Sequence, residues 1–148
     1  MNVEHRVVCV GCGAINRLPA ERDAAVAKCG GCGAPLFAGK PADVEGASFE
    51  RQISKSTLPI VVDVWAPWCG PCRAMAPEYE KAATAIEPHA RFLKLNSDAE
   101  QAIAARLGIR GIPTMLLFKD GKELGRVSGA MSAAQIGRWV GQQLKAEA

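Results

Sequence analysis

A pair of cysteines at the junction between a predicted strand and a predicted helix constrains this chain most. The run 59–65 is short, apolar and rich in β-branched residues, which is typical of a buried strand. The segment 70–87 is rich in Ala, Glu, Met and Lys, which favours a helix. Cys69 and Cys72 therefore lie at the start of this helix, where backbone N–H groups favour a thiolate at Cys69. Because a thiolate is the attacking species in disulfide exchange, the junction predicts a redox site.

Residues 68–72, with the sequence Trp-Cys-Gly-Pro-Cys, resemble the active-site motif of the thioredoxin family. The resemblance covers roughly residues 44–146 and continues at Asp63, Pro77, Lys94, Gly111-Ile112-Pro113-Thr114 and Gly129. It implies the thioredoxin fold and a protein-disulfide reductase, in which Cys69 is the nucleophile and Cys72 resolves the mixed disulfide. Residues 1–38 lie outside an ordinary thioredoxin, and the whole chain resembles members of the family that carry an N-terminal zinc-binding extension.

The resemblance also implies a substrate surface and a set of partners. A cis proline at Pro113 would expose the backbone of Ile112 to an extended substrate peptide, which would pair with it as a β-strand does. Gly129 either leaves room for that peptide or makes a turn. The expected partners are protein disulfide substrates and an NADPH-dependent thioredoxin reductase, and no organic cofactor is expected. The expected substrate-binding residues are Trp68, Gly70, Pro71, Ile112, Pro113, Gly129 and Ala130.

Asp63 is a carboxyl group inside the apolar run of the predicted strand. Burial disfavours its charged form, so we expect a raised pKa and a role as the buried base that deprotonates Cys72. The alternative is an aspartate at a strand edge that pairs with a surface cation. Lys94 lies in the alternating run 91–96, and in the family the matching lysine lies near the buried carboxylate. Lys94 is expected either to tune Asp63 or to be solvated.

The first 38 residues contain Cys9-x2-Cys12 and Cys29-x2-Cys32, with 16 residues between the two pairs. This spacing matches four-cysteine zinc sites, in which thiolates about 2.3 Å from the metal complete a closed tetrahedron. A glycine follows each pair and lets the backbone turn tightly. Because the segment has little apolar core, a structural Zn²⁺ would supply its folding free energy, and oxidation of the thiolates would release the metal as a form of regulation. Two disulfides or reactive thiols are the alternatives.

Charge and hydropathy exclude several other classes of protein. The 148 residues carry a net charge of +3, from 18 basic and 15 acidic residues that are interspersed. The chain has no run of basic residues that would indicate a binding surface for nucleic acid or membrane. No 18-residue apolar stretch is present, and the first residues lack the basic and apolar regions of a secretory signal. We therefore expect a cytoplasmic monomer without a membrane span, in which the six cysteines serve metal or redox chemistry.

The remaining pattern predicts an α/β protein with the element order β-α-β-α-β-α-β-β-α. Such an order implies a mixed central sheet flanked by helices on both faces. Asp120-Gly121 predicts a tight hairpin, and capping patterns begin at Asp98 and Ser132. The expected organisation is a zinc-ribbon-like unit in residues 1–38, a linker in 39–43 and a thioredoxin domain in 44–148.

Two other functions remain open from the sequence. The first is a disulfide oxidase or isomerase. Such relatives usually carry a histidine between the cysteines, where this chain has Gly70-Pro71, and usually an export signal.

The second is a non-enzymatic module, with the zinc unit as an adaptor for protein or nucleic acid. The intact set of Cys69, Cys72 and Asp63 argues against a pure scaffold. Residues 1–38 hold four basic and three acidic residues, which argues against nucleic-acid binding.

Overall fold

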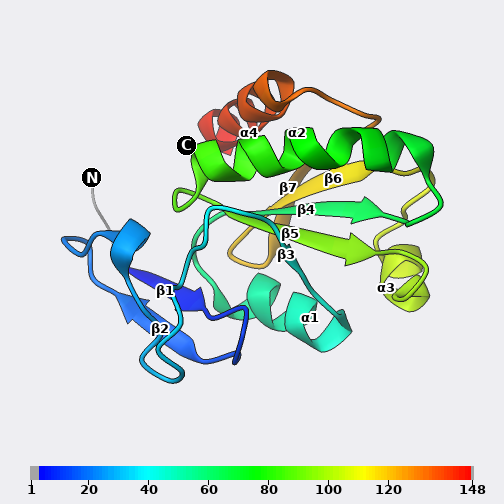
Figure 1. Ribbon diagram of the computed structural model, residues 1–148. Coiled ribbons are helices and arrows are strands. Elements are labelled where there is room, and N and C mark those ends of the chain that lie inside the picture. The colour runs from blue at the N-terminus through cyan, green and yellow to red at the C-terminus, as the bar shows by residue number, and fades with distance from the viewer. Residues whose placement is uncertain (1–3, 148) are drawn as a thin grey trace.

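A five-stranded mixed sheet forms the centre of the computed structural model, which describes residues 4–147 (Figure 1). The strands β3, β5 and β4 run parallel, β6 is antiparallel to β4, and β7 is antiparallel to β6, as the predicted order of elements requires. The central strand β4 is paired along both edges. In order across the sheet, the strands are β3 (Ala42–Asp43), β5 (Arg91–Asn96), β4 (Ile60–Trp65), β6 (Thr114–Lys119) and β7 (Lys122–Ser128).

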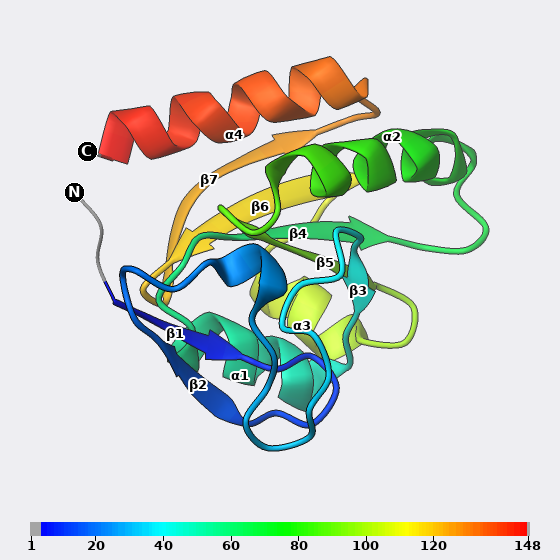
Figure 2. The same cartoon turned by 60° about the vertical axis from the view of Figure 1, so that its left-hand side comes forward.

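Helices cover both faces of this sheet (Figures 1 and 2). Because side chains alternate along a strand, Val61 packs with residues of α2 and α4, whereas Val62 packs with residues of α1 and α3. Asp63 has the parity of Val61, so its side chain lies on the face covered by α2. The predicted mixed sheet flanked by helices is confirmed. The helices are α2 (Gly70–Ile86) and α4 (Ala133–Glu147) on one face and α1 (Gly46–Lys55) and α3 (Gln101–Arg106) on the other.

Two local predictions near the C-terminus are confirmed. Asp120 and Gly121 form the two-residue loop between β6 and β7, with φ angles of 52° and 80°. Both residues thus adopt the left-handed conformation that a tight hairpin needs. The Ser132 hydroxyl accepts from the Gln135 N–H at 3.2 Å, and the Gln135 amide oxygen accepts from the Ser132 N–H at 2.9 Å. This reciprocal pair is the predicted capping box before α4.

The N-terminal residues form a small unit with a core of its own. Strands β1 (His5–Val8) and β2 (Ile15–Leu18) pair antiparallel, and the short 3-10 helix η1 (Ala24–Val26) follows. Its buried side chains include Leu36 and Phe37, and Leu58, which lies just before β4, packs among them. Figure 2 shows this unit, in blue, lying beside α1. The N-terminal unit is therefore packed against the domain that follows it.

A buried arginine joins the N-terminal unit to the central sheet. The Arg91 guanidinium donates to the carbonyl oxygens of Leu36 at 2.8 Å and Val8 at 3.0 Å. It also lies over the Phe37 ring, 4.4 Å from the centroid. Arg91 is only 3% exposed. Because it is the first residue of β5, the N-terminal unit is bonded directly to a strand of the central sheet.

Helix α1 and its C-cap residue make a second set of bonds to the N-terminal unit, at the end of strand β1. The Gln52 side-chain amide donates to the Val8 carbonyl oxygen at 3.0 Å, and the Ser56 hydroxyl accepts from the Val8 N–H at 3.2 Å. Gln52 and Ser56 are both buried. Val8 immediately precedes Cys9, so these bonds fix the backbone at the first cysteine of the four-cysteine pattern.

The segment expected to be a linker is partly structured. Ala42 and Asp43 form the edge strand β3, which pairs in parallel with Leu93 and Lys94 of β5. Ahead of β3, the Gly39 carbonyl oxygen accepts from the Thr84 hydroxyl at 2.7 Å. Residues 42 and 43 thus belong to the sheet of the following domain, while the division into separately folding units remains a prediction.

We predict that Arg91→Met lowers the free energy of unfolding by about 2 kcal/mol, because the Leu36 and Val8 carbonyl oxygens lose a charged donor. Methionine retains an apolar stem, so packing against Phe37 is largely kept. Urea denaturation measures the change, and limited proteolysis reports detachment of the N-terminal unit. Arg106→Met, which removes an exposed arginine paired with Glu50, is the control. Equal stability of the two variants would show that Arg91 does not join the units.

Candidate active site and metal centre

Cys69 and Cys72 lie where the central strand passes into a helix. β4 ends at Trp65, and α2 begins at Gly70 with Cys69 as its N-cap residue. The two cysteines form a disulfide, with their Cα atoms 5.2 Å apart. The Cys72 N–H donates to the Cys69 sulfur at 3.2 Å. The partial positive charge of the helix N-terminus is thus directed at Cys69, which favours its thiolate when the disulfide is reduced.

The surface beside the disulfide combines an exposed indole with the exposed first turn of a helix. Trp68 is 66% exposed, and Gly70 and Pro71 are exposed in the first turn of α2. The Ile112 carbonyl oxygen lies 3.8 Å from the Cys69 sulfur, and the Ile112–Pro113 bond is cis, as the resemblance implies. The structure therefore brings Ile112 close to Cys69, which directly follows Trp68, although the two segments are distant in sequence.

Gly129 is joined to the same loop. Its N–H donates to the Pro113 carbonyl oxygen at 2.9 Å, and its φ of 102° lies in the left-handed region that favours glycine. A Cβ atom at Gly129 would meet no other atom within 4 Å. Gly129 therefore lies in a bend of the chain, and room at this position for a substrate peptide stays a prediction. Ala130 follows it and is exposed.

Asp98 has a different role from the one predicted. It is not the N-cap of α3, because Glu100 occupies that position and makes no side-chain cap bond. The side chain of Asn96 instead accepts from the Asp98 N–H at 2.9 Å, and the Asp98 carboxylate accepts from the Trp68 indole N–H at 2.8 Å. The predicted cap is wrong because Asn96, two residues earlier, holds the turn. Asp98 orients the exposed indole, and no local pattern reveals a bond across 30 residues.

Asp63 is buried in the central strand. It is 1% exposed, and its Oδ1 atom has no hydrogen-bond partner among residues 4–147. Burial raises the pKa of Asp63 from 3.8 to about 7, against the opposing charge of Lys94. The alternative of a surface ion pair at a strand edge is contradicted, because β4 is paired on both sides.

The side chains of Lys94 and Tyr79 lie near this carboxyl group. Lys94 is the register partner of Asp63 in β5, and its ammonium lies 4.3 Å from the centroid of the Trp65 ring. It is thus partly buried against an indole rather than freely solvated. The Tyr79 hydroxyl of α2 donates to the Leu93 carbonyl oxygen at 2.7 Å and lies 3.2 Å from the Val61 carbonyl oxygen. Burial, with the nearby Asp63 charge, raises the pKa of Tyr79, so this hydroxyl stays protonated.

The four remaining cysteines form one cluster. The sulfur atoms of Cys9, Cys12, Cys29 and Cys32 all lie within 4.8 Å of one another. Cys9 and Cys32 sulfurs are 3.7 Å apart, and Cys12 and Cys29 sulfurs are 3.6 Å apart. Thiolates about 2.3 Å from a tetrahedral zinc would be separated by about 3.8 Å. The cluster therefore fits Zn²⁺, and the sulfurs are too far apart for disulfides, whose bond is about 2.05 Å.

The backbone around the two cysteine pairs is nearly the same. The Cys9 N–H donates to the Ala14 carbonyl oxygen at 2.9 Å, and the equivalent bond from Cys29 to Ala34 is 2.8 Å. The glycines that close the turns, Gly13 and Gly33, have φ angles of 77° and 80°. Both turns are the tight glycine turns that the sequence predicts after each cysteine pair. We call Cys9–Ala14 the first knuckle and Cys29–Ala34 the second.

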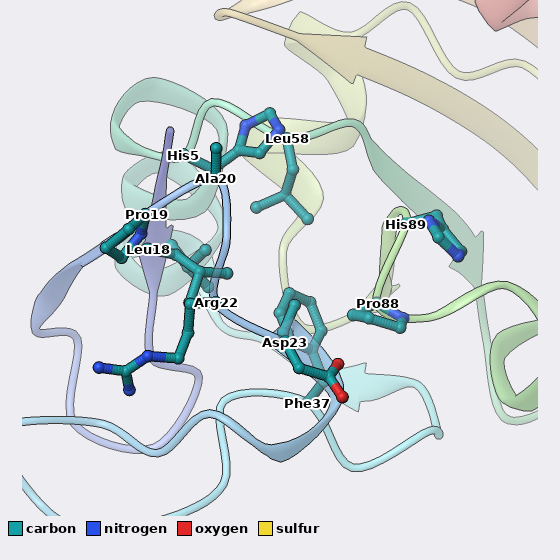
Figure 3. Close-up of a pocket in the computed structure, with 12 residues that line it drawn as sticks. His5, Leu18, Pro19, Ala20, Arg22, Asp23, Phe37, Leu58, Pro88 and His89 are labelled. Atoms are coloured by element: carbon teal, nitrogen blue, oxygen red, sulfur yellow. The ribbon is translucent and has the colours of Figure 1, made fainter. Parts of the chain in front are cut away.

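A separate cavity of about 340 Å³ lies between the N-terminal unit and the main domain (Figure 3). Leu18 and Phe37 of the N-terminal unit line it together with Leu58 and Pro88, which come later in the chain. Neither the disulfide nor any of the clustered cysteines lines this cavity. The redox site therefore lies outside this cavity.

A family model described as thioredoxin matches residues 40–142. The chain belongs to the thioredoxin family. A second model, described as the N-terminal part of thioredoxin 2 and representing a zinc ribbon, matches residues 8–34. The protein is thus a dithiol–disulfide oxidoreductase with the thioredoxin fold, and Cys69–Cys72 is its active-site disulfide. The N-terminal unit is the zinc-ribbon domain, whose cysteine cluster is consistent with zinc binding.

Individual thioredoxins are similar over most of their length. Thioredoxin C-3 of Corynebacterium nephridii is 37% identical over 139 residues, covering 94% of this chain and 95% of that protein. The thioredoxin of Porphyra purpurea is 42% identical over 93 residues, covering 63% of this chain and 87% of its own. The structure of a mutant thioredoxin from Halobacterium salinarum matches with a TM-score of 0.65 at 29% identity, covering 72% of this chain and 93% of that one. Within residues 4–147, no helix has the length and apolar character needed to cross a bilayer.

We predict that Asp63→Asn stabilises the protein in a pH-dependent way. The folded-state pKa of about 7 lies above the unfolded value near 3.8, so the folded protein binds the extra proton between these values. The stability of the parent therefore falls as pH rises from about 4 to about 7 and then levels off, whereas asparagine has no such loss. The advantage of the variant should reach at most the order of 4 kcal/mol above pH 7.

Urea denaturation at a series of pH values measures this difference. Asp43→Asn removes an exposed carboxylate from the same sheet and is the control, with little expected change. A stability difference between Asp63→Asn and the parent that stays constant from pH 4 to 8 would contradict the raised pKa.

Proposed function

We propose that this thioredoxin reduces disulfides in substrate proteins. The observation that supports the proposal is the position of Cys69 at a helix N-terminus, beside the exposed Trp68 and 3.8 Å from the Ile112 carbonyl oxygen. A nucleophilic thiolate and a surface for an extended peptide are thereby combined. The proposed substrate surface combines exposed residues with the half-buried Ile112 and the buried Pro113 of the cis bond. The exposed residues are Trp68, Gly70, Pro71, Gly129 and Ala130.

The reaction is two successive thiol–disulfide exchanges. The Cys69 thiolate attacks one sulfur of the substrate disulfide, and the other substrate sulfur leaves as a thiolate. Cys72 then loses its proton and attacks the Cys69 sulfur, which releases the second substrate thiolate. Two electrons have passed to the substrate, and Cys69–Cys72 is oxidised. An NADPH-dependent thioredoxin reductase returns two electrons to this disulfide.

Asp63 acts as the base for Cys72, through an intervening water. Its pKa of about 7 lies near the working pH, which is where a general base is most effective. Lys94 counteracts the effect of burial and so keeps the pKa of Asp63 from rising further. Lys94 is therefore a positioning and tuning residue, whereas the proton passes to Asp63.

The N-terminal unit binds one Zn²⁺ through Cys9, Cys12, Cys29 and Cys32, and the metal is structural. Four protein sulfurs would fill the four ligand positions of a tetrahedral zinc and would leave no open position for catalysis. A reducing compartment keeps such thiols reduced, so we propose that the protein works in the cytoplasm. Release of zinc on thiol oxidation would add regulation.

We predict that Cys72→Ser accumulates a mixed disulfide with a reducible substrate such as insulin, because attack by Cys69 proceeds and resolution does not. Cys69→Ser should form no such adduct at this site and should lose reduction entirely. Non-reducing gels and mass spectrometry detect the adduct, with the Cys69→Ser, Cys72→Ser double variant as the control for the four zinc cysteines. An adduct formed by Cys69→Ser and absent from Cys72→Ser would reverse the two roles.

We predict one zinc per chain in the reduced protein purified after zinc-supplemented expression. Cys29→Ser should lose the metal and unfold the N-terminal unit, because metal binding supplies its folding free energy. The Cys69→Ser, Cys72→Ser double variant should keep full zinc, since the active-site cysteines are outside the cluster. Metal analysis by mass spectrometry decides the prediction. Iron in place of zinc, or zinc well below one per chain in the parent, would refute it.

A further inference from the structure

We propose that Asn16 is a positioning residue for the metal centre, which it serves by donating a hydrogen bond to the thiolate of Cys29. The proposal rests on zinc binding at the four cysteines, and it adds a residue to that site. Asn16 lies in β2, opposite Val7 of β1, and is half-buried. It belongs to neither knuckle.

The side chain of Asn16 is bonded to both knuckles. Its Nδ2 donates to the Ala14 carbonyl oxygen at 3.2 Å and to the Cys29 sulfur at 3.4 Å. Its Oδ1 accepts from the Gly30 N–H at 2.8 Å. Ala14 ends the first knuckle, whereas Cys29 and Gly30 belong to the second. One amide group thus ties together the two halves of the metal site.

The chemistry of these three partners requires an amide. A carbonyl oxygen and a thiolate both need a donor, and a backbone N–H needs an acceptor. Asn16 supplies two donors and one acceptor from a single planar group. Aspartate would keep the acceptor for Gly30 and lose both donors, and alanine would lose all three bonds. These two substitutions therefore separate the donor function from the remaining contacts.

Donation to Cys29 matters because of the charge on the centre. Four thiolates around one Zn²⁺ leave a net charge of −2, held mostly on sulfur. A donor to one sulfur spreads that charge and fixes the orientation of the ligand. The Gly31 N–H donates to the same sulfur at 3.3 Å. Cys29 is buried, whereas Cys12 and Cys32 are exposed, so protein groups must replace the water that would otherwise solvate it.

The test is binding of Co²⁺ and Zn²⁺ to the full chain in the parent, Asn16→Asp, Asn16→Ala and Arg17→Gln. Arg17 is the matched control, because its side chain is exposed and forms an ion pair with Glu4 away from the cluster. Co²⁺ in a four-thiolate site gives visible bands from its tetrahedral geometry and a sulfur-to-cobalt charge-transfer band that depends on the electron density at sulfur. Competition with a chelator gives the Zn²⁺ affinity.

We expect both Asn16 variants to bind Zn²⁺ about 10-fold to 100-fold more weakly than the parent, the usual effect of losing an outer-shell partner of a ligand. Their charge-transfer bands should move to longer wavelength, and Arg17→Gln should match the parent in both measurements. Normal affinity in both variants would overturn the proposal. So would weak binding by Asn16→Asp alone, since repulsion by the new carboxylate would explain it.

Weaker binding with unshifted charge-transfer bands would also overturn the proposal, because Asn16 would then only support the hairpin. If the parent itself forms no tetrahedral cobalt centre, both the zinc site and the role of Asn16 fail. A normal centre in the parent with unchanged variants removes only the role of Asn16.

Discussion

The parallel pairing of β4 with β5 is the contact on which the two functional regions depend. β4 carries the buried Asp63 and leads directly into the disulfide loop. β5 begins with Arg91, which holds the N-terminal unit, and places Lys94 opposite Asp63. It ends with Asn96, which holds the turn that contains Asp98, and Asp98 in turn orients Trp68. A single strand therefore connects the metal-binding unit, the buried carboxyl group and the substrate surface.

Burial explains why this arrangement is both costly and useful. Asp63 occupies a core position in which an apolar side chain would stabilise the sheet, and its raised pKa measures the unfavourable environment of the charged form. The same environment gives the carboxyl group an affinity for a proton that suits exchange with a thiol. Arg91, like Asp63, is a buried ionisable group. Burial lowers the pKa of its guanidinium, and the nearby charges of Glu87 and Cys9 oppose that effect. In each case the surrounding core holds an unfavourable group in place.

Features that depend on neighbours in sequence were predictable. The strand, cysteine motif and helix around Cys69 follow from local pattern, and so do the hairpin at Asp120 and the knuckles around Cys9 and Cys29. Features that depend on contacts across the fold were not. Arg91 resembles any arginine at the start of a strand, and Asn16 resembles any polar residue in a hairpin. Asp98 has the sequence pattern of a helix cap, yet Asn96 takes over the turn and leaves the Asp98 carboxylate to bind Trp68.

The reduction potential of the Cys69–Cys72 couple tests the central claim, that this thioredoxin acts as a reductase, most directly. Equilibration with a dithiothreitol or glutathione redox buffer, followed by Trp fluorescence or thiol alkylation, gives the value. We expect a potential near about −270 mV, the general value for thioredoxins. A potential near that of a strong disulfide oxidant, about −120 mV, would contradict the claim and make the protein a donor of disulfides.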